Sequence, residues 1–145
     1  MTHLELLLVI TIMVLAALVA IPRYANAMSN YRADMAARRI VADLRWAQAR
    51  ARNQSTSQTV TFNTTNSTYQ IVGANDPDHI ASGYTVDLTA DPYRAAITSV
   101  SLGTQPQVVF NGYGIPTNGG TIVVGSGGAQ KTITIETTAG AITTQ

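Results

Sequence analysis

The first 55 residues carry two apolar patterns in succession. An uncharged, almost entirely apolar run spans residues 6–21, with Glu5 just before it and Pro22 just after it. Over residues 29–52, apolar side chains recur every three or four positions, which is the period of a helix with one buried stripe: Ala33, Ala37, Ile40, Leu44, Ala47 and Ala51. The pattern predicts one long helix to about residue 53, bent or loosened at Pro22, where a helical hydrogen bond is lost.

Beyond residue 57 the apolar period changes from helical to alternating. Val60 and Phe62 alternate with polar residues, and Tyr69 and Ile71 follow the turn residues 63–66, so this segment is expected to form a hairpin. Further strands are expected between Gly-, Pro- and Asp-rich turns, at residues 84–88, 96–102, 107–110, 121–124, 132–136 and 141–144.

One helix followed by a run of strands predicts an α+β fold, with a long N-terminal helix packed against a C-terminal antiparallel β domain. We expect the helical stripe to pack against the sheet that contains Val60, Phe62, Val109 and Phe110. The chain then divides into a hydrophobic N-terminal helix, residues 1–28, and a globular domain, residues 29–145. That domain comprises a helix at about 29–53 and a β-rich part at 57–145.

Composition narrows the class of protein. The chain has no cysteine among its 145 residues, so no disulfide braces it. Charged residues make up 12%, about half the usual share, and the net charge is +1. Seven of the nine basic residues lie between Arg23 and Arg52. A low-charge, Thr- and Gly-rich C-terminal half favours an extracellular β structure or a packed filament surface over a cytosolic enzyme.

Glu5 is the first candidate functional residue. The sixteen residues from Leu6 to Ile21 would make a helix of about 24 Å, which approaches the length of a bilayer span. A carboxylate beside such a segment is costly to bury, by about 2–3 kcal/mol near the bilayer centre. A charged residue in that position usually has a partner and a function.

The N-terminal segment resembles the type IV pilin and pseudopilin superfamily through residues in one register: Met1, Thr2, His3, Leu4, Glu5, Leu6 and Pro22. The resemblance implies that a prepilin peptidase removes a short basic leader and methylates the new amine of Met1. It also implies that Glu5 meets the methylated amine of a neighbouring subunit, and that the helix just before Pro22 unfolds locally on assembly. Two residues depart from the family pattern: Met1 replaces the usual Phe, and His3 replaces an apolar residue.

The C-terminal half is similar to the GspH/FimT-like pseudopilins. The similarity rests on the phrase Val109-Phe110-Asn111-Gly112-Tyr113-Gly114, followed by the expected strands at 121–124, 131–136 and 140–142. It implies that two β-sheets follow the helix.

Other candidate sites receive less support. Arg38, Arg45 and Arg52 recur on one helix face and are possible nucleic-acid contacts, but phosphate binding needs cations without balancing acids, and Asp34 and Asp43 lie among them. The run Asp76-Pro77-Asp78-His79 is a turn signal rather than a metal site. We predict no catalytic residue, no cofactor and no metal.

We therefore expect a structural subunit of a type IV pilus-like filament or a type II secretion pseudopilus, and we favour a main filament subunit. The alternatives are a minor tip pseudopilin that initiates assembly, which the C-terminal similarity favours, and a DNA-binding minor pilin of an uptake pilus. Expected partners are further copies in a helical homopolymer, other pilins and pseudopilins, the prepilin peptidase, and an inner-membrane assembly platform with its ATPase. The monomer would reside in the inner membrane before it joins a periplasmic or extracellular filament.

Overall fold

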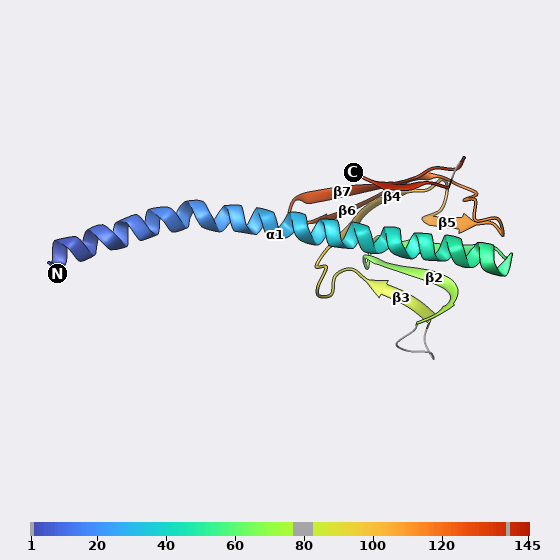
Figure 1. Cartoon of the computed structure of the whole chain (residues 1–145), viewed down its shortest axis with the longest axis horizontal. Helices are drawn as coiled ribbons and strands as arrows, with labels where there is room; N and C mark the ends of the chain where they lie inside the picture. The colour runs from blue at the N-terminus through green and yellow to red at the C-terminus, as the bar shows by residue number, and fades with distance from the viewer. Residues whose placement is uncertain (1, 77–82, 139) are drawn as a thin grey trace.

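The computed structural model describes residues 2–76, 83–138 and 140–145. A continuous helix of 52 residues, α1 (His3–Gln54), is followed by eight strands within the described ranges. The strands are β1 (Gln58–Asn63), β2 (Thr68–Asn75), β3 (Gly83–Asp87), β4 (Ala96–Ser101), β5 (Gln107–Phe110), β6 (Gly120–Ser126), β7 (Ala129–Ile135) and β8 (Ile142–Thr144). The N-terminal half of α1 projects beyond the β domain, and the C-terminal half lies against it (Figure 1).

Both ends of α1 are capped by neighbouring residues. Thr2 is the N-cap, and its Oγ1 accepts a hydrogen bond from the backbone N–H of Glu5 at 3.4 Å. Ser55 ends the helix in the left-handed conformation, with φ of 51°. Pro22 lies inside the helix, which continues through it and is visibly bent in this region (Figure 1). The predicted single helix, its end and its bend are confirmed.

The strands form two antiparallel sheets of four. Sheet A has the order β3-β2-β1-β5, and sheet B has the order β4-β6-β7-β8. The predicted first hairpin is confirmed, with Val60 opposite Ile71 and Phe62 opposite Tyr69. Its turn is closed by the Oδ1 atom of Asn63, which accepts hydrogen bonds from two backbone N–H groups further along the turn.

The hairpin formed by β6 and β7 is longer than the sequence pattern indicates. We expected strands at 121–124 and 132–136 around a glycine-rich turn, but pairing extends to Ser126 opposite Ala129. The turn is the dipeptide Gly127-Gly128, whose φ angles of 53° and 92° are left-handed. A two-residue turn of this kind matches the twist of the flanking strands, so they pair up to the turn itself.

The core lies between the C-terminal half of α1 and both sheets. Every residue of the predicted helical stripe is buried. Val108 and Phe110 of β5 are fully buried, whereas Val109 is only partly buried. The expected packing of the helical stripe against the sheet that contains Val60, Phe62, Val109 and Phe110 is confirmed. Val109 lies on the other face of β5, because successive side chains of a strand point to opposite faces. Sheet B contributes a largely aliphatic inner face: Ile97, Ile122, Val124, Ile133, Ile135 and Ile142.

Candidate assembly helix and its attachment to the β domain

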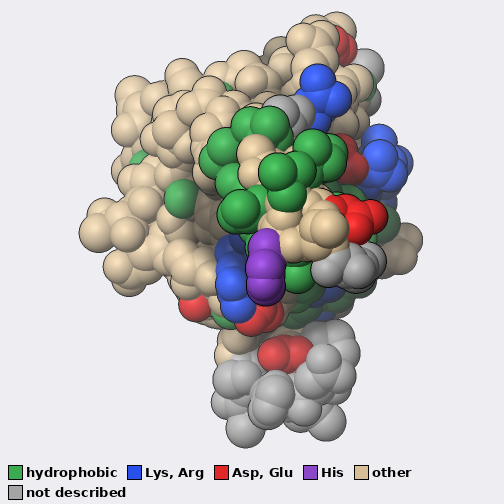
Figure 2. Space-filling model, turned by 90° about the vertical axis from the view of Figure 1, so that its left-hand side faces the viewer, with side chains coloured by type: hydrophobic (Ala, Val, Ile, Leu, Met, Phe, Trp, Pro, Cys, Tyr) green, Lys and Arg blue, Asp and Glu red, His purple; other side chains and the backbone are tan. Residues whose placement is uncertain are grey.

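The N-terminal half of α1 presents a long apolar surface that no part of the chain within the described residues covers. Every described side chain from His3 to Ala27 is exposed, and Met13 and Ile21 are each 67% exposed. Seen from this end, hydrophobic side chains gather on the helix in front of a β domain that shows few charges (Figure 2). By length and composition α1 is able to cross a membrane. An exposed apolar surface of this size marks a membrane or protein contact.

Glu5 lies in the first turn of α1, where Thr2 caps its backbone N–H. The residues Thr2-His3-Leu4-Glu5 match the capping-box pattern, in which the first and fourth residues cap each other's backbone N–H groups. The structure shows one half of this arrangement, the hydrogen bond from the N–H of Glu5 to Thr2. A carboxylate in the first turn also interacts favourably with the helix dipole. The T-x-x-E spacing was the sequence signal for this role.

Two groups named from the sequence lie wholly or partly outside the described residues. Met1, with the N-terminal amine expected to meet Glu5, is one of them. Most of the run Asp76-Pro77-Asp78-His79 is another, since only Asp76 is described. Within the described ranges, no group of three or more His, Asp or Glu side chains is placed to hold a metal ion.

A polar cluster attaches α1 to sheet A. Asp43 is 8% exposed and accepts hydrogen bonds from the hydroxyls of Tyr69 at 2.5 Å and Tyr84 at 3.0 Å. Arg39, one turn earlier in the helix, donates to Asp43 at 3.1 Å and to the hydroxyl of Tyr84 at 2.7 Å. Each buried polar group in this set has a partner, as stable burial requires. Arg39 and Asp43, which are an i,i+4 pair on α1, are thus part of a partly buried network rather than a solvated pair.

The two tyrosines remain protonated donors in this cluster. Burial raises the pKa of the Tyr69 hydroxyl well above its ordinary value, and the negative charge of Asp43 raises it further. The pKa of Tyr84 is raised for the same two reasons. Both hydroxyls therefore keep the hydrogen that they donate to Asp43.

Trp46 belongs to the same face of the helix. Its ring lies 5.5 Å from the ring of Tyr84, with 32° between the two planes, and the guanidinium of Arg50 lies 5.6 Å from the indole centroid. Arg50 also donates to the backbone carbonyl of Gly73 in β2, at 2.8 Å. Trp46 is thus part of the attachment of α1 to sheet A.

The three arginines considered for nucleic-acid binding are exposed, and each has a partner within the chain. Arg38 pairs with Asp34 at 2.7 Å. Arg45 donates to the carbonyl of Ile142 in β8, and Arg52 donates to the carbonyl of Tyr113. The last two therefore hold the edge of sheet B and the loop after β5 against the helix.

Gln48 strengthens this second attachment from within the core. Its amide nitrogen donates to the carbonyls of Gly114 at 2.8 Å and Gly140 at 3.1 Å. A Cβ atom at Gly140 would lie 2.6 Å from that nitrogen, so the turn before β8 depends on glycine here. The helix thus binds sheet A through Asp43 and the loops at the other side of the domain through Gln48.

The sequence matches the family described as type II transport protein GspH over residues 36–139, which is more than half of the chain. The chain belongs to the GspH family. No curated protein matches the sequence closely enough to add to this assignment.

Two solved structures share the fold of this chain. The minor pseudopilin EpsH from the type 2 secretion system of Vibrio cholerae has a TM-score of 0.58 at 11% identity, covering 79% of this chain and 96% of EpsH. The type IV minor pilin FimU of Pseudomonas aeruginosa has a TM-score of 0.54 at 16% identity, covering 78% of this chain and 87% of FimU. At these identities the likeness establishes the type IV pilin-like α+β fold.

Membership of the GspH family decides the broad class of function. The family is one of type II secretion pseudopilins, so the chain is a structural protein and not an enzyme. Membership implies contact with other pseudopilins and with the secretion machinery. The exposed apolar half of α1 is consistent with membrane anchoring.

Proposed function

We propose that this chain is a minor pseudopilin, which waits in the inner membrane and joins a pilus-like secretion filament near its tip. The observation that carries the proposal is the GspH-family domain, whose fold is shared with a minor pilin and a minor pseudopilin. These comparisons support the alternative reading of the sequence better than a main filament subunit.

In this proposal the two halves of α1 have different tasks. The apolar half holds the monomer in the membrane and then packs among the apolar helices of neighbouring subunits. Glu5 pairs with the N-terminal amine of a neighbour, and this pairing offsets much of the cost of burying either charge in an apolar bundle. Pro22 lacks the N–H that would bond one turn back, so local unfolding before it costs less than elsewhere in the helix.

The capping box makes a sharp test of Glu5 possible. Glu5→Gln keeps a residue that is able to complete the box but removes the charge, whereas Thr2→Ala removes the cap and keeps the charge. We expect both variants to reach the membrane at normal levels, because neither adds a charge to the span. We expect Glu5→Gln to be lost from filaments and Thr2→Ala to be incorporated.

The assay is the ratio of chain in sheared filaments to chain in the membrane fraction, in cells that express each variant from the native locus. Equal incorporation of Glu5→Gln and the unchanged chain would remove the charge pair from the proposal. Loss of Thr2→Ala but not of Glu5→Gln would assign the first turn a capping role instead.

A further inference from the structure

The outer face of sheet A carries a regular row of uncharged polar side chains. In the strand register Gln107 lies opposite Thr61, Thr61 lies opposite Gln70, and Gln70 lies opposite Thr85. One such residue therefore comes from each of β5, β1, β2 and β3. Neighbouring strands are about 4.8 Å apart, so the row extends over about 14 Å. We call these four residues the Gln–Thr track.

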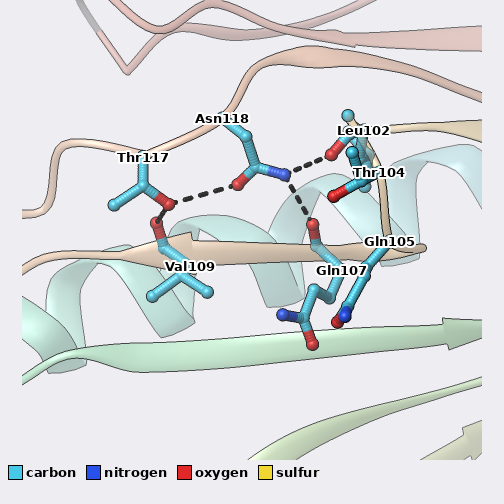
Figure 3. A pocket seen from close by; sticks show the side chains of 8 residues that line it. Leu102, Thr104, Gln105, Gln107, Val109, Thr117 and Asn118 are labelled. Atoms are coloured by element: carbon cyan, nitrogen blue, oxygen red, sulfur yellow. Dashed lines mark hydrogen bonds between the residues drawn. The ribbon is translucent and has the colours of Figure 1, made fainter.

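The Gln–Thr track begins in a hollow of about 390 Å³ beside β5, lined by Gln107 together with Thr104, Gln105, Val109, Thr117 and Asn118. Figure 3 shows the side chains of Gln107 and Val109 leaving β5 on one side and Asn118 lying on the other. A second hollow, of about 290 Å³, includes the track residues Thr61, Gln70 and Thr85. The Gln–Thr track thus runs along a surface with two shallow hollows.

The hollow beside β5 is held in place by hydrogen bonds. The Asn118 amide donates to the carbonyl of Gln107 at 2.8 Å and to the carbonyl of Leu102 (Figure 3). Thr117 donates its backbone N–H to the carbonyl of Val109 at 2.8 Å. Further along the track, the amide nitrogen of Gln70 would lie 3.0 Å from a Cβ atom at Gly83, so glycine leaves room for this side chain over β3.

The chemistry of the track selects an uncharged partner. Glutamine amides and threonine hydroxyls both donate and accept hydrogen bonds, as the hydroxyl groups of a sugar do. Among the outward-facing residues of these four strands the charged one is Asp87, at the end of β3, and its carboxylate already accepts two hydrogen bonds from Thr89. A face without cations does not suit nucleic acid or an acidic polymer.

The same composition argues against a protein partner. The centres of protein interfaces are enriched in Tyr, Trp, Phe, Met and Arg, and none of these belongs to the track. A repeating row of hydrogen-bonding groups instead fits a polymer that repeats its own hydroxyl groups. We propose that the Gln–Thr track, with the hollow at its β5 end, binds a neutral glycan chain.

The proposal is tested by titrating neutral hexasaccharides, cellohexaose and maltohexaose, into the full chain held in a detergent without a sugar headgroup. We expect saturable binding of at least one of them by calorimetry. Thr61→Val and Gln107→Leu should each weaken binding about three- to tenfold, the loss expected for one hydrogen bond. Thr134→Val is the matched control, because Thr134 lies in a similar hydroxyl row on sheet B, between Thr121 and Thr143.

Two further ligands test the class of partner: hexagalacturonate, which is anionic, and a Gly–Ser hexapeptide. Neither should bind as tightly as the better neutral hexasaccharide. Tighter binding of either one, no binding of the neutral glycans, or equal weakening by Thr134→Val and Thr61→Val would each overturn the proposal. Trp46 emission reports whether each variant is folded, and Thr85→Ala, on the edge strand β3, replaces any variant that is not.

Discussion

Replacing Asp43 by alanine tests how α1 is attached to sheet A. The substitution removes the acceptor used by the hydroxyls of Tyr69 and Tyr84 and by the guanidinium of Arg39. An unsatisfied buried donor costs about 1–3 kcal/mol. Two buried tyrosine hydroxyls lose their acceptor, while the side chain of Arg39 is 42% exposed and recovers water. We expect Asp43→Ala to lower the free energy of unfolding by about 3 kcal/mol.

Asp34 supplies the matched control for this substitution. It also forms an i,i+4 pair with an arginine, Arg38, in the opposite order along the helix and at the shorter distance of 2.7 Å, but the side chains of Asp34 and Arg38 are 39% and 77% exposed. An exposed pair is worth about 0.5 kcal/mol, so Asp34→Ala should be nearly neutral. The larger loss of stability in Asp43→Ala than in Asp34→Ala would then be due to the burial of Asp43 and its hydrogen bonds with the two tyrosines, and not to the ion pair itself.

Urea unfolding of the full chain in detergent, followed by the emission of Trp46, gives both values. The probe is well placed because its ring lies 5.5 Å from that of Tyr84. Similar losses of stability for Asp43→Ala and Asp34→Ala would refute the reasoning, because they would mean that burial adds nothing to this cluster.

Three further predictions follow from the fold and the sequence. The free energy of unfolding should fall as the pH rises above about 10, because tyrosines in the unfolded chain then lose protons that Tyr69 and Tyr84 keep in the folded chain. Tyr69→Phe should make the fall of the urea midpoint with pH less steep. A urea midpoint that does not change with pH in the unchanged chain would contradict this prediction. A fragment of residues 29–145 should unfold cooperatively and sediment as a monomer. If this fragment assembled into filaments by itself, the apolar half of α1 would not be the assembly surface. The precursor should carry a basic leader, and the mature chain should begin with an N-methylated Met1. Intact-mass and N-terminal peptide analysis measures this, and an unmodified first residue with no upstream codons would contradict the prediction.

Local patterns predicted most of the fold because they depend on neighbours in the chain. The helical stripe from Ala33 to Ala51 and the first hairpin follow from side-chain periods of 3.6 and 2, which the backbone geometry imposes. The length of β6 and β7 was missed because a Gly-Gly dipeptide fits both a short turn and a glycine-rich loop.

The attachments of α1 were not predictable from spacing. The sequence shows Arg39 and Asp43 as an i,i+4 pair, but the burial of Asp43 depends on Tyr69 and Tyr84, which are 26 and 41 positions away. The stacking of Trp46 depends on the same pairing of β2 with β3. The capping role of Thr2 was readable from the spacing of Thr2 and Glu5, by contrast, because both residues belong to one helical turn.

The copy number of this chain in filaments tests the central claim most directly. Sheared filaments would be digested with isotope-labelled reference peptides from residues 95–131, and the molar ratio of this chain to the most abundant subunit would be measured by mass spectrometry. A minor pseudopilin should be present at a small fraction of that subunit, and its deletion should reduce the number of filaments. If this chain were the most abundant subunit, the result would contradict a minor pseudopilin and would support a main filament subunit instead.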